Sequence, residues 1–114
     1  MASPFVLDRD SILDRLGGDE EIYAMMVDMY IQDVDHNCSV LADAYASGDS
    51  KSLQREAHTI KGLLATFSDE GGVADALVVE QQSREGRVEG LGAAVEGLQQ
   101  RLREVASVLA AGKA

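Results

Sequence analysis

Apolar residues recur along the chain at the spacing of an α-helix. Toward the carboxyl end, intervals of four, three, four, three and four positions separate Leu91, Val95, Leu98, Leu102, Val105 and Leu109. In the middle of the chain, intervals of four and three separate Leu53, Ala57, Ile60, Leu64 and Phe67. Each set lies on one face of a helix and predicts a buried seam. No segment alternates apolar and polar residues in the manner of a strand, so the pattern predicts an all-α protein.

Glycines and capping residues divide the chain into five helical segments. Asp19 and Asp49 stand where N-caps are expected, and Gly48 stands where a helix should end. The predicted helices cover about 8–16, 19–47, 49–67, 72–85 and 90–110. Short connections between four long helices favour an antiparallel four-helix bundle with a short additional N-terminal helix as a lid. We expect 1–114 to form a single domain.

Segment 19–47 carries a broad apolar face. We expect its methionines, Met25, Met26 and Met29, to fill the core, with exposure of part of the cluster to a partner as the alternative. Cys38 is expected to be a small packed residue. His36, among acidic neighbours, is expected to be a solvated surface residue.

Charge and cysteine content exclude several classes of function. The 20 acidic and 10 basic residues give a formal net charge of −10, which argues against nucleic acid or an anionic membrane as the main partner. A single cysteine excludes an internal disulfide and a Cys-rich zinc site. No apolar run approaches the roughly 20 residues that span a bilayer, and the N-terminal residues lack the pattern of a signal peptide. The expectation is a cytoplasmic protein.

Segment 49–67 carries the candidate chemistry. On a helix that turns by about 100° per residue, His58 lies about 140° from the centre of the apolar seam and faces solvent. Gly62, one turn later, lies about 180° from the seam, and Ala65 extends this surface of small residues. A glycine inside a helix costs about 1 kcal/mol relative to alanine. Its exposed position indicates a function that needs close approach to the histidine.

Basic residues surround this histidine although the protein as a whole is acidic. Arg55 and Lys61 lie three positions before and after His58. Residues 51–114 hold 8 basic and 9 acidic side chains, against 2 and 11 in residues 1–50. A neutral imidazole is a competent nucleophile toward an activated phosphoryl group, and a nearby ammonium offsets the charge of the phosphoryl oxygens. Because the chain has no P-loop and no kinase glycine-rich loop, the phosphoryl group is expected to come from another protein.

An exposed helix face therefore carries the string AHTIKG at residues 57–62. In an acidic helical chain of this length, the string resembles the signature of the histidine phosphotransfer (HPt) domain of multistep phosphorelays. The resemblance covers nearly the whole chain and includes an acid, Glu80, late in the next helix. It implies that His58 accepts a phosphoryl group from the aspartyl phosphate of one receiver domain and passes it to the aspartate of another. It also implies that Lys61 steadies the phosphate and that Gly62 keeps the approach open.

The resemblance also implies how such a carrier works with its partners. The partners are response regulator receiver domains and a hybrid sensor histidine kinase. The carrier itself is expected to be a monomer with no kinase or ATPase activity, no cofactor and no metal site of its own. Mg²⁺ belongs to the acidic pocket of the receiver.

Polar side chains near the histidine are expected to support it or to contact the partner. In bundles of this family a polar residue from the helix after the histidine often supports the ring, and Gln81 and Gln82 are the candidates here. Together with Arg55 and Ala65, they are expected to contact the partner.

The sequence departs from the family pattern at one position. The family commonly has a glycine six residues after Gly62, where this chain has Ser68, followed by Asp69. Gly71 and Gly72 come shortly afterwards, so we expect a displaced or lengthened turn.

Two other functions are compatible with an exposed histidine on a helix. The dimerisation module of a histidine kinase normally has an acidic residue directly after the histidine, where this chain has Thr59. A structural or adaptor bundle without phosphotransfer is the alternative from a different class. A di-iron bundle is not expected, because His36 and His58 form no Glu-x-x-His pairs.

Overall fold

The computed structural model describes residues 3–113, which form five α-helices and no strand. The helices are α1 (Arg9–Arg15), α2 (Glu20–Ser47), α3 (Ser50–Thr66), α4 (Glu70–Arg84) and α5 (Gly92–Ala111). Every predicted boundary lies within two residues of the observed one. The prediction of an all-α fold with a short additional N-terminal helix is confirmed.

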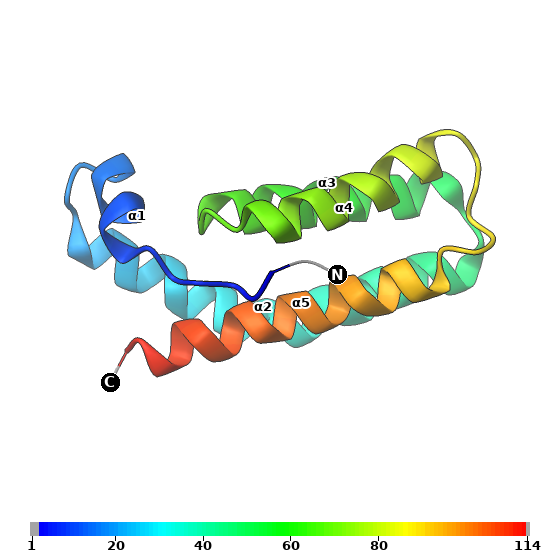
Figure 1. Ribbon diagram of the computed structural model, residues 1–114. Coiled ribbons are helices and arrows are strands. Elements are labelled where there is room, and N and C mark those ends of the chain that lie inside the picture. Colours follow the sequence, from blue (N-terminus) through cyan, green and yellow to red (C-terminus); the bar gives the residue numbers. More distant parts are fainter. Residues whose placement is uncertain (1–2, 114) are drawn as a thin grey trace.

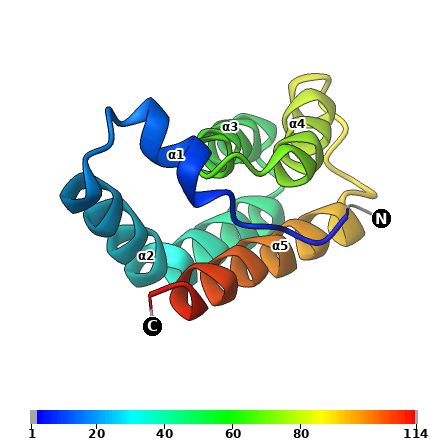
Figure 2. The same ribbon diagram turned by 60° about the vertical axis from the view of Figure 1, so that its left-hand side comes forward.

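The four long helices form two antiparallel pairs. α3 lies along α4, and α2 lies along α5, as Figures 1 and 2 show from two directions. The two pairs face each other across one core, and the described residues extend over 42 × 22 × 21 Å. Both predicted seams are buried, because none of their residues is more than 5% exposed. The bundle therefore follows from the apolar periodicity of α3 and α5.

The N-terminal half of α2 extends beyond the end of α3 (Figure 1). α3 ends near Tyr30, whose ring meets Phe67 edge-on with centroids 5.3 Å apart. From that point toward its N-terminus, α2 is no longer fully covered by α3, and Met25 and Met29 are 60% and 54% exposed. The expectation that the methionines fill the core is therefore wrong for these two, whereas Met26 is half-buried.

In the turn between α3 and α4, Ser68 stands where the resemblance leads us to expect a glycine. Ser68 has a φ of 60°, the left-handed conformation that usually favours glycine after a helix. The amides of Ser68 and Asp69 donate to the carbonyls of Ala65 and Leu64, which closes α3 with a Schellman motif. Arg15 of α1 donates to two of the last carbonyls of α3 and to the Ser68 hydroxyl. The expected displacement of the turn is wrong, because the serine adopts the glycine conformation and Arg15 holds it.

A buried ion pair connects α4 to α5. Asp69, the N-cap of α4, is 2% exposed, and its two carboxylate oxygens accept from Nε and Nη2 of Arg101 at 2.9 and 2.5 Å. The amide of Gly72 donates to the same carboxylate at 3.0 Å. Nη1 of Arg101 donates to the carbonyl of Ser3, and Phe5 of this N-terminal segment is buried. This pair fixes the start of α4 and therefore the position of the helix beside α3.

Candidate functional site

α3 presents His58 to solvent and buries its neighbours. Ala57 and Ile60 are fully buried, which fixes the rotation of the helix about its axis. The His58 side chain is 68% exposed. The orientation predicted from the helical periodicity is confirmed.

A buried carboxylate from α4 holds the imidazole. The Glu80 side chain is 4% exposed, and its Oε2 lies 2.7 Å from Nδ1 of His58. Its other oxygen, Oε1, accepts a hydrogen bond from Nζ of Lys61 at 2.6 Å. A guanidinium nitrogen of Arg84, one turn later on α4, lies 3.6 Å from Oε2. One carboxylate therefore connects the histidine with two cations.

These contacts determine which atom of the pair carries the proton. The hydrogen bond from Lys61, supported by the one from His58, lowers the pKa of Glu80 below its ordinary value, although burial acts in the opposite direction. Glu80 is thus a carboxylate at neutral pH and can only accept hydrogen bonds. The proton between the two groups therefore belongs to Nδ1 of His58. In the neutral ring, Nε2 keeps its lone pair on the side away from Glu80.

The surface next to the histidine is formed by residues with small side chains or none. A Cβ added to Gly62 would meet no atom within 4 Å beyond the local backbone of the helix, so packing does not require glycine there. Ala65, one turn further along α3, is exposed. The exposed position expected for both residues is confirmed, and an incoming surface can approach α3 closely at this point.

The other predicted site residues occupy different positions. Lys61 is 27% exposed and is engaged with Glu80 rather than free beside the histidine. Arg55 and Gln81 are exposed, and Gln82 is half-buried. The support for the ring expected from Gln81 or Gln82 comes from Glu80, so that assignment is wrong. At about 100° per residue, the two glutamines lie about 100° and 200° around α4 from Glu80 and do not face α3.

The supporting role of Glu80 could have been found from the register of the helices. His58 and Glu80 lie equally far in sequence from Asp69, which follows the turn. In an antiparallel hairpin, residues equally distant from the turn lie side by side. The expectation of a displaced or lengthened turn after Ser68 changed the predicted register and concealed this pairing.

The remaining chemically active side chains lie outside this cluster. His36 is exposed, and Cys38 is a free thiol that is 1% exposed, as expected for both. Within residues 3–113, no three His, Cys, Asp or Glu side chains come together in a group that could hold a metal ion. In the same range, no helix is both long and apolar enough to cross a membrane.

Comparison with known proteins agrees with this geometry. The family model of the Hpt domain matches residues 25–108. The chain belongs to the Hpt domain family. Its fold is similar to that of histidine-containing phosphotransfer protein B (HptB) from Pseudomonas aeruginosa PAO1, with a TM-score of 0.84, 20% sequence identity and 96% of each chain covered. No curated protein matches the sequence significantly.

Membership of this family decides the general function. An Hpt domain is a histidine phosphotransfer intermediate of phosphorelays, a carrier that interacts with receiver domains and kinases. The resemblance drawn from residues 57–62 is confirmed at the level of the family.

Proposed function

We propose that His58 is the phosphoacceptor of this Hpt domain and exchanges a phosphoryl group with the aspartate of a receiver domain. The observation that carries the proposal is the 2.7 Å contact between Nδ1 of the exposed His58 and Oε2 of the buried Glu80. This contact supports Nε2 as the nucleophile, because it occupies the other ring nitrogen with a proton. The exposed surface of Gly62 supports the access that a second protein needs.

The transfer balances with Nε2 as the attacking atom. Its lone pair forms the P–N bond while the P–O bond to the receiver aspartate breaks, and the bonding electrons leave with the aspartate carboxylate. The ring keeps its proton on Nδ1 and becomes cationic. The Glu80 carboxylate, 2.7 Å away, stabilises this developing positive charge. The reverse sequence passes the phosphoryl group to the next receiver and restores the neutral ring, so no proton is gained or lost.

Lys61 acts through the same carboxylate. In the resting state its ammonium donates to Oε1 of Glu80 and offsets the buried negative charge. An ammonium has three N–H groups, so the two that remain can donate to phosphoryl oxygens held at Nε2 of His58. Lys61 is therefore a positioning residue for Glu80 and a ligand for the phosphoryl group. Ala65 on α3 and Gln81 on α4 are both exposed and are proposed to contact the receiver.

The carrier is a cytoplasmic monomer with no kinase or ATPase activity of its own. It needs no cofactor, and the Mg²⁺ of the reaction belongs to the carboxylates of the receiver. A hybrid sensor histidine kinase supplies the phosphoryl group through its receiver domain. Sedimentation of the purified chain and its incubation with labelled ATP test these statements: a dimer or hydrolysis of ATP would contradict them.

The central test follows labelled phosphate from a receiver domain to the histidine. The receiver used is the one from the source organism that labels the wild-type chain fastest. Wild type should acquire acid-labile label, and His58→Gln should acquire none. His36→Gln is the matched control because it removes the other exposed histidine, and it should retain full labelling. Acid-labile label on His58→Gln would show that another residue is the acceptor.

A further inference from the structure

The exposed face of α3 differs on the two sides of His58. Toward the N-terminus of the helix, Lys51 and Arg55 lie within about 60° of the histidine around the helix axis. Toward the C-terminus, the residues within the same angle are Gly62, Ala65 and Lys61, whose ammonium is bound to Glu80. One half of the face therefore carries two cations, and the other half carries two small residues and one cation that Glu80 already binds.

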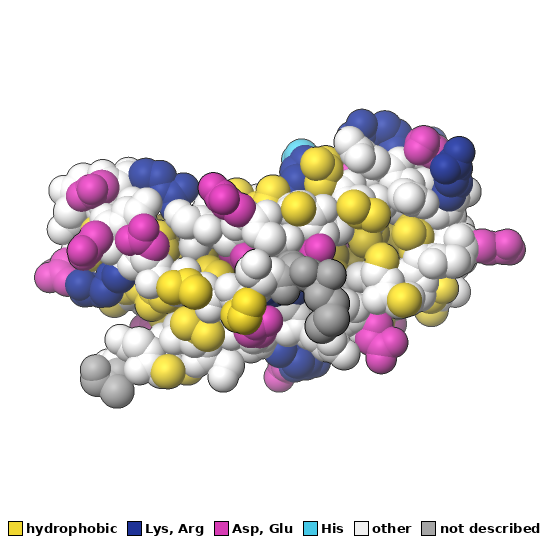
Figure 3. All heavy atoms as spheres, in the orientation of Figure 1, with side chains coloured by type: hydrophobic (Ala, Val, Ile, Leu, Met, Phe, Trp, Pro, Cys, Tyr) yellow, Lys and Arg dark blue, Asp and Glu magenta, His cyan; other side chains and the backbone are white. Residues whose placement is uncertain are grey.

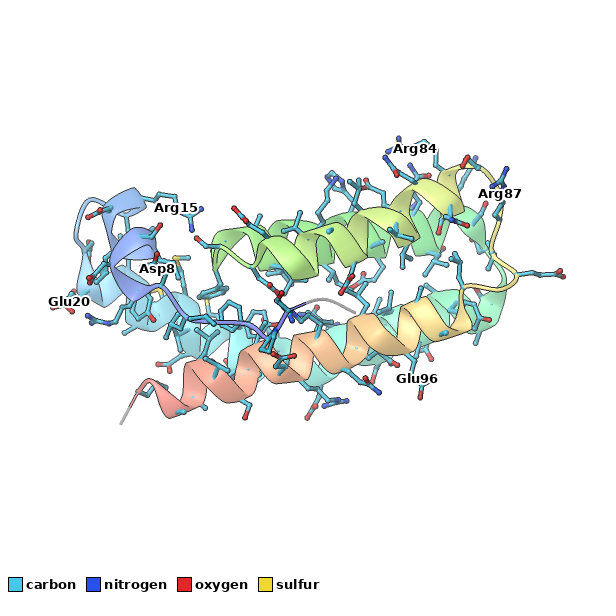
Figure 4. The ribbon with its side chains drawn as sticks, in the orientation of Figure 1. Asp8, Arg15, Glu20, Arg84, Arg87 and Glu96 are labelled. Carbon is cyan, nitrogen blue, oxygen red and sulfur yellow. The ribbon has the colours of Figure 1, made fainter. Side chains whose placement is uncertain are left out.

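α4 and the connection to α5 extend the cationic half. Because α4 is antiparallel to α3, its C-terminal end lies beside the N-terminal end of α3 (Figures 1 and 2). Arg84, in the last turn of α4, has a side chain that is 59% exposed, and Arg87 is exposed in the connection that follows. Figure 4 shows both pointing away from the bundle at this end, and Figure 3 shows Lys and Arg side chains gathered there. We name Lys51, Arg55, Arg84 and Arg87 the cationic end.

The charges of the cationic end are largely unpaired. Within residues 3–113, no carboxylate forms an ion pair with Lys51, Arg55 or Arg87. The exposed acids of the same connection are Glu85 and Glu89. Glu85 lies about 100° around the helix from Arg84 and so faces another side.

Most basic residues elsewhere on the protein are neutralised by a neighbour. Arg9 pairs with Glu20, Arg101 with Asp69, Arg103 with Asp35, and Lys113 with Asp28. The available positive charge of a protein with net charge −10 is thus concentrated beside His58.

The flank of α3 that faces α2 offers an apolar groove instead. This groove, of about 250 Å³, is lined in part by Met26, Met29, Leu63 and Phe67 and holds one acid, Asp33. A protein that docks over His58 therefore meets positive charge toward the N-terminus of α3 and small side chains toward its C-terminus, with the apolar groove on the flank beside α2. The two sides are chemically different, so they can distinguish one docking orientation from its reverse.

We propose that the cationic end binds the acidic rim of the receiver domain and sets the orientation in which the receiver docks on His58. The inference rests on the proposed function. The receiver is the occupant that fits, because its phosphoacceptor aspartate lies in a pocket of carboxylates that hold Mg²⁺, and this pocket must come within bonding distance of Nε2. An acidic partner is repelled by the protein as a whole, so local positive charge decides both the rate of encounter and its geometry.

The test compares two double variants that change the net charge equally. Arg55→Glu with Arg87→Glu reverses two charges of the cationic end. Arg103→Glu with Lys113→Glu reverses two charges that belong to ion pairs on α2 and α5. For each variant, the second-order rate of transfer from the phosphorylated receiver is measured at several salt concentrations. Each rate is divided by the rate at which phosphoramidate, a small phosphodonor that needs no docking, labels the same variant.

The first double variant should lower the normalised rate about tenfold at low salt, and the deficit should shrink as added salt screens the charges. The control should change the rate by less than about twofold. Equal losses in both variants would show a general effect of net charge, and no loss in the first would show that docking ignores the cationic end; either result overturns the inference. If neither the receiver nor phosphoramidate labels wild-type His58, the proposed function itself fails.

Discussion

Two buried carboxylates near the opposite ends of α4 are bonded to cations, yet one serves the fold and the other serves the site. Asp69 and Arg101 are both buried, at 2% and 6% exposure, and bind each other through two hydrogen bonds. Glu80 is equally buried, but its partner His58 is 68% exposed and Lys61 is 27% exposed. In the first pair, Asp69 and Arg101, both side chains are buried, and we call it the closed pair. In the second, Glu80 and His58, the carboxylate is buried and the imidazole is exposed to solvent, and we call it the open pair. A carboxylate that stabilises a reacting ring must be placed in this way.

The largest expected effect is the loss of the closed pair. Asp69→Asn leaves the Arg101 guanidinium buried without a counter-charge and places an amide group against its N–H donors. Breaking a buried ion pair in this way costs about 3–5 kcal/mol. Denaturation by urea, followed by circular dichroism, should show a fall of this size in the free energy of unfolding. A loss below about 1 kcal/mol would mean that the pair is accessible to water and not closed.

The glycine beside the closed pair should be nearly as sensitive. A Cβ on Gly72 would lie 2.1 Å from Oδ2 of Asp69 and 2.8 Å from Cδ1 of Leu64. Gly72→Ala must therefore displace the carboxylate from Arg101 or open the α3–α4 turn. We expect a loss of about 2–3 kcal/mol in the free energy of unfolding, as for other overpacked interiors. If the urea concentration at the midpoint of unfolding did not change, the close approach of Gly72 to Asp69 and Leu64 would be contradicted.

The open pair should affect the reaction more than the fold. Glu80→Gln keeps a hydrogen-bond acceptor for Nδ1 of His58 but removes the charge that we propose stabilises the cationic ring. Transfer at saturating receiver should slow about tenfold or more, with little change in the receiver concentration that gives half the maximal rate. Stability should fall by only about 1 kcal/mol. Glu70→Gln, which removes an exposed carboxylate in the first turn of the same helix, should leave transfer unchanged.

A rise in the half-maximal receiver concentration with no change in the maximal rate would contradict this role. It would place Glu80 in docking instead of in the chemistry.

The pH dependence of stability provides a finer measure of the open pair. The pKa of Glu80 in the folded protein is lowered from its ordinary value of 4.5, chiefly by the hydrogen bond from Lys61. A lowered carboxylate pKa stabilises the folded state fully above the ordinary value and loses that contribution as the pH falls through the lowered one. The difference in unfolding free energy between wild type and Glu80→Gln, about 1 kcal/mol near pH 6, should therefore shrink as the pH falls below 4.5 and vanish once the pH is below the lowered pKa. A difference that grows toward acid pH would contradict the ionised state of Glu80.

The comparison also shows which parts of the molecule the sequence could predict. The rotation of α3 follows from its apolar seam, so the exposure of His58 and Gly62 was predictable. The register of α4 against α3 depends on the turn at Ser68, whose left-handed conformation is held by Arg15, a residue distant in sequence. Without that register, Glu80 could not be assigned to His58.

The exposed methionines illustrate a second limit. Periodicity identifies the apolar face of α2, but it does not show where the neighbouring helix ends. Met25 lies past the end of α3, and Met29 lies where that helix ends, beside the groove lined by Leu63 and Phe67. Their exposure follows from the difference in length between the two helices. Length differences are visible in the predicted boundaries, so this error was avoidable.

The smallest effect concerns the glycine beside the open pair, and it should have the opposite sign to that of Gly72. Gly62→Ala adds a methyl group where nothing lies within 4 Å, so helix propensity should raise the free energy of unfolding by about 0.5–1 kcal/mol. The methyl group would also stand where we propose that the receiver approaches, so transfer should slow severalfold. Gly97→Ala, at an exposed glycine within α5 that also has open space around it, is the matched control. It should give the same gain in stability with no change in transfer. If both variants transfer at the wild-type rate, the missing side chain at Gly62 does not serve the approach of a partner to His58.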